Sequence, residues 1–132
     1  MLFRSDQYIS LHVRRGDYIG LEYILPTQDM QYYNRALEYF TDNIPVVVLS
    51  DDIEWCRSVF VGDRFTFSQG TPYDDMRIMI QSSGNIMSNS SYAWWGAFLS
   101  RNKNVVMPLN WFGKLAPFHT SEELLMDGWT IC

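Results

Sequence analysis

Short apolar runs alternate along the chain with longer segments in which apolar residues recur every three or four positions. The short runs are rich in β-branched residues and predict buried strands, whereas the periodic segments predict helices. The expected strands are 8–13, 45–49, 64–68, 85–88 and 105–107, and the expected helices are 29–40, 53–60, 73–82, 92–99 and 120–126. Because strands that alternate with helices form parallel sheets, we predict an α/β, Rossmann-like domain with helices on both faces, spanning residues 1–132.

Three polar clusters directly follow expected strands. They are His12 to Asp17, Ser50 to Asp52, and Asn89 to Ser91. Ligands of open parallel sheets bind beyond the carboxyl ends of the strands. We therefore expect the three clusters to line one edge of the sheet and to form the binding site there.

Adjacent arginines at the end of the first strand point to an anion. The guanidinium groups of Arg14 and Arg15 can donate paired hydrogen bonds to phosphate oxygens in one plane. The alternative is that they pair with nearby carboxylates such as Asp17. Ser90 and Ser91 begin an expected helix, whose free N–H groups and dipole attract phosphate, although plain helix capping explains serines there as well. Together the two features predict a phosphate site.

Two acidic pairs, Asp51-Asp52 and Asp74-Asp75, suggest a divalent metal, since paired aspartates hold such an ion on the diphosphate of some nucleotide sugars. Both pairs stand where a helix is expected to begin, so helix capping explains them without an ion. We predict no metal. A single carboxylate can also accept the two N–H donors on the edge of guanine, and Asp75 is our candidate for that contact.

Aromatic residues make up 16% of the chain, which suits either a thick core or a surface that faces carbohydrate. Trp94 and Trp95 lie inside the expected helix 92–99. We expect both indoles in the core, in preference to a position of one of them at the wall of a cleft.

The formal charge of −5 argues against a nucleic-acid partner, because binding to a phosphate backbone needs a clustered positive surface. Cys56 and Cys132 have no metal-ligand spacing and are not expected to form a disulfide, which favours a reducing compartment. The sequence contains no apolar stretch of roughly 18 residues that would span a bilayer. We expect a cytoplasmic protein, either free or peripheral at the membrane.

Four separated strings resemble the C-terminal portion of the α1,2-fucosyltransferases, glycosyltransferase family 11, and above all its bacterial members. The strings are His12–Tyr18, Ser50–Cys56, Asp74–Met76 and Asn89–Ala97. They occur in order and at suitable separations, so the resemblance covers nearly the whole chain. The chain departs from the family at Met87-Ser88, where Ile-Ala usually precedes Asn-Ser, and we ascribe this change to packing of the strand.

The resemblance implies the two-lobed GT-B architecture, of which this chain is similar to the C-terminal lobe alone, with the N-terminal lobe absent. It implies GDP-fucose as the donor and no metal or other cofactor. A similar string in the α1,6-fucosyltransferases implies that Arg14 contacts the β-phosphate, with Arg15 beside it, and that His12 holds the nucleoside. By the same comparison Asp75 reads guanine, and Ser91 with Ser90 lies at the phosphates.

The activity implied by the resemblance is transfer of L-fucose, with inversion, to the 2-hydroxyl of a terminal galactose on a glycan acceptor. Comparison with the α1,6 enzymes aligns Glu22 with the carboxylate that is proposed as their catalytic base, and Asp17 is the competing candidate for the base. Arg14 would stabilise the charge that grows on the leaving phosphate. Two alternatives stay open: a GDP-sugar-binding module or truncated fragment without activity, and a transferase that uses an aspartate pair to hold a metal.

Overall fold

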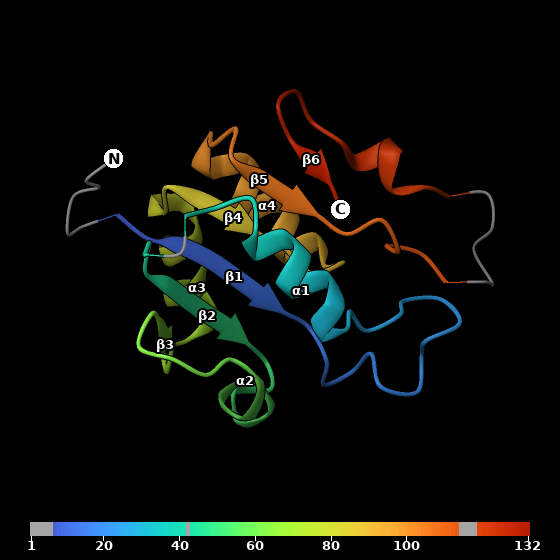
Figure 1. Cartoon of the computed structure of the whole chain (residues 1–132). Coiled ribbons are helices and arrows are strands. Elements are labelled where there is room, and N and C mark those ends of the chain that lie inside the picture. Colours follow the sequence, from blue (N-terminus) through green and yellow to red (C-terminus); the bar gives the residue numbers. More distant parts are fainter. Residues whose placement is uncertain (1–6, 42, 114–118) are drawn as a thin grey trace.

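A six-stranded parallel sheet forms the centre of the molecule in the computed structural model, which describes residues 7–41, 43–113 and 119–132 (Figure 1). The strands are β1 (Ile9–Val13), β2 (Val46–Ser50), β3 (Phe65–Phe67), β4 (Gly84–Ile86), β5 (Val105–Met107) and β6 (Thr130–Ile131). The helices are α1 (Met30–Leu37), α2 (Ile53–Val59), α3 (Pro72–Gln81), α4 (Ser91–Ser100) and the short 3₁₀ helix η1 (Ser121–Leu124). The predicted α/β class is confirmed.

The order of the strands reverses beside β1. The sheet runs β3-β2-β1-β4-β5-β6, so the chain moves outward from β1 to β3 and then returns to the other side of β1. Ile9 is in register with Val46 of β2 on one side and with Gly84 of β4 on the other. In a sheet of this kind the loops after the two strands at the reversal diverge and leave a crevice between them. The loops after β1 and β4 are therefore the natural walls of a site.

Helices cover both faces of the sheet, with α1 in front and α3 and α4 behind in Figure 1. Ile9, Leu11 and Val13 of β1 belong to the same apolar cluster as buried residues of α1 and α2. The side chains between them, Ser10 and His12, point to the opposite face, as the alternation of a strand requires. A second apolar cluster joins α3 and α4 to the other face of the sheet. Its buried members are Leu49, Met79, Met87, Ala93, Ala97, Val105, Met107, Trp111 and Trp129.

Strand β4 fits closely between its neighbours. A Cβ on Gly84 would lie 2.6 Å from the ring of Phe40 and 3.0 Å from the carbonyl oxygen of Asn104, so a larger residue cannot start this strand without a shift of its surroundings. The next residue, Asn85, is buried and donates to Ser10 Oγ at 2.8 Å. A buried amide is stable only when its hydrogen bonds are made, and these bonds fix the position of β4 against β1.

Two features of the C-terminal region differ from the sequence prediction. The helix expected at 120–126 is the single 3₁₀ turn η1, which a capping box formed by Thr120 and Glu123 starts. Strand β6 was not predicted, because a run of two residues after Gly128, whose φ is +87°, carries too little periodicity to indicate a strand. It is recognisable by its pairing with β5, in which Val106 is in register with Thr130.

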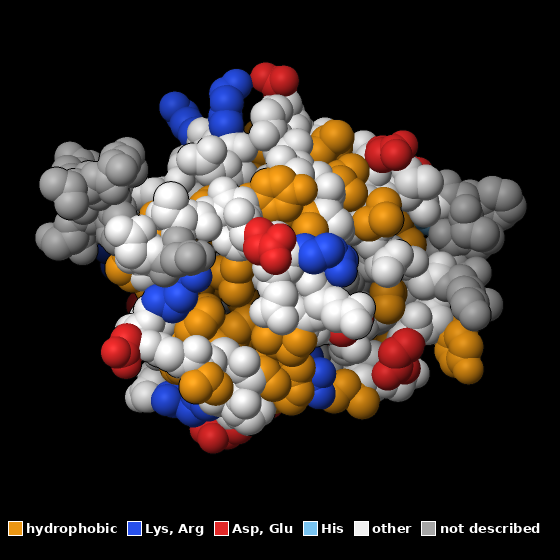
Figure 2. Space-filling model, viewed as in Figure 1, with side chains coloured by type: hydrophobic (Ala, Val, Ile, Leu, Met, Phe, Trp, Pro, Cys, Tyr) orange, Lys and Arg blue, Asp and Glu red, His pale blue; other side chains and the backbone are white. Residues whose placement is uncertain are grey.

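The surface carries dispersed charge. On the face shown in Figure 2, Lys and Arg side chains are interspersed with Asp and Glu side chains among apolar and uncharged groups. Cys56 is buried and Cys132 is partly buried, and both are free thiols. None of the helices within the described part of the chain has the length and apolar character needed to cross a membrane.

Candidate functional site

The ends of β1 and β2 and the first turns of α3 and α4 surround a small hollow of about 180 Å³, which we call the edge hollow. The structure thus brings together members of two of the three predicted clusters, along with Asp75. The third predicted cluster begins α4, whose second residue, Tyr92, also lines the hollow. The lining residues are His12, Arg14, Ser50, Asp51, Pro72, Asp75 and Tyr92.

His12 lies at the base of the edge hollow and is 5% exposed. Its Nδ1 is 2.8 Å from Ser88 Oγ, and its ring centroid is 5.5 Å from that of Tyr92. Burial lowers the pKa of His12 to about 4, so the imidazole is neutral at pH 7. We ascribed the serine at position 88 to strand packing, but its hydroxyl contacts this predicted site residue across the crevice between β1 and β4.

Arg14 follows β1 directly, and its guanidinium group forms a bidentate pair with the carboxylate of Asp17. Its Nε and Nη2 donate to the two carboxylate oxygens of Asp17 at 2.8 and 2.7 Å. The Nε atom is also 3.6 Å from an oxygen of Asp51, and the guanidinium carbon lies 5.5 Å from the centroid of the Tyr18 ring. The hydrogen bonds from Arg14 lower the pKa of the Asp17 carboxyl. The pairing with Asp17 therefore exists, and it orients a guanidinium that still lines the hollow.

Arg15 points elsewhere. Its Nε lies 3.3 Å from Asp52 Oδ2, and its guanidinium carbon is 4.1 Å from the centroid of the Trp55 ring on α2. The predicted donor-binding role of its side chain has no support in this geometry, because Arg15 is absent from the lining of the edge hollow. The backbone is used instead: Asp51 accepts from the N–H groups of Arg15 and Gly16 at 3.0 and 2.8 Å.

The acidic pairs have separate structural roles. Asp51 holds the loop after β1, and Asp52 caps α2 by accepting from Trp55 N. Asp74 forms a capping box with Thr71 at the start of α3. Within the described residues, no group of three or more His, Cys, Asp or Glu side chains is placed to share a metal ion.

Asp75 occupies the first turn of α3 and faces the edge hollow. Its Oδ1 accepts a hydrogen bond from Ser68 Oγ at 2.5 Å. Partial burial raises the pKa of Asp75, and the bond from Ser68 opposes that shift. The remaining oxygen is an acceptor available to a ligand that presents N–H donors.

The start of α4 stands between two openings in the surface. Ser90 is its N-cap and is buried, with its Oγ 3.5 Å from Ala93 N. Ser91, the first residue of the helix, is exposed. Asn89 donates its amide to the carbonyl oxygens of Pro26 and Trp111 at 2.7 and 3.0 Å, which ties the loops after β1 and β5 to the helix start.

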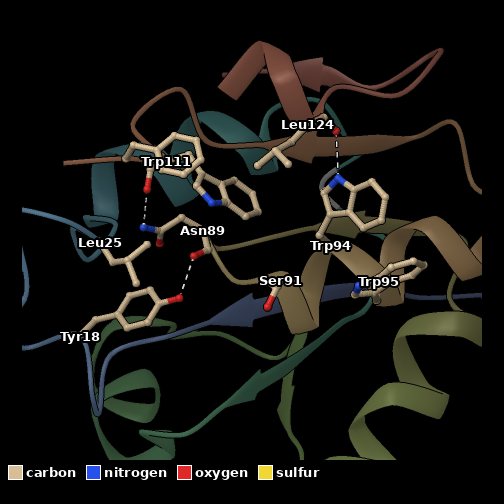
Figure 3. A pocket seen from close by; sticks show the side chains of 9 residues that line it. Tyr18, Leu25, Asn89, Ser91, Trp94, Trp95, Trp111 and Leu124 are labelled. Carbon is tan, nitrogen blue, oxygen red and sulfur yellow. Dashed lines mark hydrogen bonds between the residues drawn. The ribbon is translucent and has the colours of Figure 1, made fainter. Parts of the chain in front are cut away.

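The larger opening, which we call the tryptophan cavity, has a volume of about 410 Å³ and was not predicted (Figure 3). We expected Trp94 and Trp95 in the core, but both line this cavity and Trp95 is 51% exposed, so that expectation is wrong for Trp95. The sequence of the helix does not indicate which of two adjacent tryptophans is covered by a loop from elsewhere in the chain. The lining residues are Tyr18, Leu25, Asn89, Ser91, Trp94, Trp95, Trp111, Phe112 and Leu124.

Glu22 belongs to the loop between β1 and α1 and lines neither opening. Its two carboxylate oxygens lie 2.9 and 3.0 Å from the N–H group of Gly20. That hydrogen bond lowers the pKa of the Glu22 carboxyl. The side chain is exposed, and Tyr18 and Leu25, which flank it in the same loop, line the tryptophan cavity.

Comparison with known proteins identifies the family. The model of glycosyl transferase family 11 matches residues 1–132. The chain belongs to this family. It is 35% identical, over 91% of its length, to the O-antigen biosynthesis glycosyltransferase WbnK of Escherichia coli, and 32% identical, over 84%, to an alpha-1,2-colitosyltransferase of the same organism. Identity to the galactoside 2-alpha-L-fucosyltransferase Sec1 of Mus musculus is 30% over 89% of the chain.

The chain spans less than half the length of these relatives: it covers 43% of WbnK, 43% of the colitosyltransferase and 35% of mouse Sec1. No solved structure matches it. The strand reversal and the edge hollow both lie at the carboxyl end of β1.

The burial of His12 predicts a pH dependence of stability. Its folded pKa of about 4 lies below the ordinary value of 6.5, so between these values the unfolded chain binds a proton that the folded chain does not. The stability is complete above pH 6.5 and falls as the pH drops toward 4. From pH 7 to pH 5, His12 should account for a loss of about 2 kcal/mol in the free energy of unfolding.

Urea unfolding at the two pH values tests this expectation with His12→Gln, which should show a correspondingly smaller loss. The matched control is His119→Gln, which removes the exposed histidine and should behave as the wild type. An equal loss in the wild type and in His12→Gln would show that His12 is not buried in its neutral form.

Proposed function

We propose that the chain binds GDP-fucose at the carboxyl ends of β1 and β4, and that it serves as the donor-binding part of a galactoside α1,2-fucosyltransferase. The observation that carries the proposal is the position of Arg14, which lines the edge hollow together with Asp75. Similarity to mouse Sec1 and to galactoside alpha-(1,2)-fucosyltransferases of other mammals supports fucose as the sugar and galactose as the acceptor.

The diphosphate has two sources of stabilisation in this arrangement. A guanidinium has five N–H donors, and Asp17 takes two of those of Arg14, so three are left for phosphate oxygens. The N-terminus of α4, with the exposed Ser91, supplies free N–H groups and the positive end of a ten-residue helix. These groups suit an anion in a chain whose net charge is −5.

The nucleoside is assigned to the edge hollow. The carboxylate of Asp75 can accept from the two N–H donors on the edge of guanine, a pattern that adenine does not present. The bond from Ser68 Oγ holds that carboxylate in place. His12, whose Nδ1 is engaged with Ser88 Oγ, has its Nε2 left for the nucleoside.

The proposed reaction is a direct displacement with inversion. The oxygen of the galactose 2-hydroxyl forms a bond to the anomeric carbon of fucose, and the bond from that carbon to the β-phosphate oxygen breaks. The electron pair leaves with GDP, and the proton of the hydroxyl passes to a carboxylate base. Arg14 would stabilise the charge that develops on the phosphate; loss of one such donor costs about 3 to 4 kcal/mol in the barrier of other enzymes.

Glu22 is the better candidate for the base. Asp17 holds Arg14 with both of its oxygens, so its part is that of a positioning residue. The Glu22 carboxylate accepts from the N–H group of Gly20, and Glu22 lies in the loop that borders the tryptophan cavity. No metal is assigned a role, because Asp51 holds the loop after β1, Asp52 and Asp74 cap helices, and Asp75 is assigned to guanine.

The alternative is a GDP-sugar-binding module without transfer activity. It applies to the 132 residues taken alone, since acceptor binding and exclusion of water need walls in addition to the donor site. Incubation of the chain with GDP-fucose and a galactoside separates the two functions: product formation supports the transferase, and donor binding without product supports the module.

The role of Arg14 predicts unequal effects of two adjacent substitutions. Arg14→Lys should weaken GDP binding by about tenfold, because an ammonium group cannot span two phosphate oxygens as a guanidinium does. Arg15→Lys is the matched control and should change the affinity less than threefold, about 0.6 kcal/mol, since its side chain contacts α2. Isothermal titration calorimetry measures both constants, and equal losses would contradict the assignment.

The role of Asp75 predicts a change in base preference. Asp75→Asn replaces one acceptor with a donor and should reduce the preference for GDP over ADP by about tenfold, the worth of a bidentate contact to a base edge. Asp74→Asn alters the neighbouring carboxylate, which caps α3, and should leave the preference unchanged. Competition of GDP and ADP for the chain measures the ratio. An unaltered ratio in Asp75→Asn would reject the guanine contact.

A further inference from the structure

Adjacent residues at the start of α4 line the tryptophan cavity and the edge hollow. Ser91 lines the tryptophan cavity, and the next residue, Tyr92, lines the edge hollow. Tyr18 lines the cavity as well, and the Arg14 guanidinium lies 5.5 Å from the centroid of its ring. The two groups assigned to the diphosphate, Arg14 and the N-terminus of α4, therefore stand at the boundary between the two openings.

The polar groups around the tryptophan cavity are mostly engaged with the protein itself (Figure 3). The hydroxyl of Tyr18 donates to the carbonyl oxygen of Asn89 at 2.9 Å, and Nε1 of Trp94 donates to the carbonyl oxygen of Leu124 at 2.8 Å. Ser91, which also lines the cavity, is an exposed polar residue. An occupant must therefore present an apolar side to the indole and leucine walls.

One buried acceptor beside the cavity lacks a donor. The amide nitrogen of Asn89 is bonded to two carbonyl groups, but its Oδ1 is buried without a partner among the described residues. A buried acceptor left unpaired costs free energy, so such an atom is expected where a water or a ligand hydroxyl completes the site. The cavity thus suits a ligand that is mainly apolar and carries few hydroxyl groups.

We propose that the tryptophan cavity holds the transferred sugar of the donor and selects a 6-deoxy sugar through contact with its methyl group. The inference rests on the proposed function. A nucleotide sugar is linear, with the diphosphate between the base and the sugar. When the base occupies the edge hollow and the diphosphate lies at Arg14 and Ser91, the sugar extends to the far side of the α4 terminus, where the tryptophan cavity opens.

The physical basis of selection is the cost of a buried hydroxyl. Aromatic walls attract the apolar face of a pyranose ring and its methyl group, and pockets for small ligands are lined mainly in this way. A sugar with a hydroxymethyl group at the same carbon would bring a hydroxyl against the carbon faces of the aromatic walls, which do not replace the hydrogen bonds that it makes to water. L-Fucose and L-galactose differ by this hydroxyl alone, so they form a matched pair of probes.

The test measures dissociation constants of the 132-residue chain for GDP, GDP-L-fucose and GDP-L-galactose by isothermal titration calorimetry. We expect GDP-L-fucose to bind at least fivefold more tightly than GDP-L-galactose. Trp95→Ala alters a half-exposed side chain and so leaves the core intact. It should weaken the binding of GDP-L-fucose by about fivefold and reduce the preference for this sugar nucleotide over GDP-L-galactose. The dissociation constant for GDP should stay within about twofold of the wild-type value.

The control variant is Leu99→Ala. Leu99 lies on the same helix with a similar exposure, but it lines a different surface hollow, with Lys103 and Trp129, so all three constants should stay as in the wild type. Equal affinity of the wild type for the two sugar nucleotides would overturn the proposal. A Trp95→Ala variant with unchanged affinity for GDP-L-fucose would also overturn it, as would one whose affinity for GDP falls as much as its affinity for GDP-L-fucose. Failure of the chain to bind GDP would instead contradict the proposed function.

Discussion

The parallel pairing of β1 with β2 on one side and with β4 on the other determines where the remaining functional groups lie. Because β1 is buried on both faces, its residues alternate between an apolar cluster under α1 and α2 and a polar contact with β4. All three strands end at the same edge, so Arg14, Asp51 and the start of α4 meet there. The crevice at the strand reversal follows from the order of the strands and does not depend on any particular side chain.

The loop after β1 is fixed by a carboxylate from the neighbouring strand. Asp51 accepts from the N–H groups of Arg15 and Gly16 and leaves room for no side chain at Gly16, where a Cβ would lie 2.7 Å from its Oδ2. With the backbone held, Asp17 orients the guanidinium of Arg14. A cationic group is thus preorganised at the strand end, which is the condition for strong stabilisation of a developing negative charge.

Much of the fold follows from local patterns. The apolar runs at β1, β2 and β5 are strong signals, so these strands were predictable within a few residues. Strand β6 depends on its pairing with β5, and no local pattern in the sequence predicts it. For the site, the meeting of His12, Arg14 and Asp51 at one edge followed from the order of strands and helices, whereas the presence of Asp75 there did not.

The directions of individual side chains were not predictable. Arg14 and Arg15 are adjacent residues of the same type, yet Arg14 lines the edge hollow and Arg15 stacks on Trp55. The partners of Arg15, Asp52 and Trp55, lie far from it in the sequence, so the sequence around Arg15 does not indicate them. The tryptophan cavity depends on the loops after β1 and β5, which Asn89 joins to α4. Long-range contacts of this kind decide which of two adjacent tryptophans is covered.

The central claim is that a nucleotide diphosphate binds across the start of α4. Its most direct test is a titration of the ¹⁵N-labelled chain with GDP, followed by the shifts of the backbone amide signals. We expect the largest shifts at Ser90, Ser91 and Arg14, with smaller ones near Asp75. Largest shifts at the opposite end of α4, near Arg101 and Lys103, would contradict it, because they would place the diphosphate at a different cationic surface.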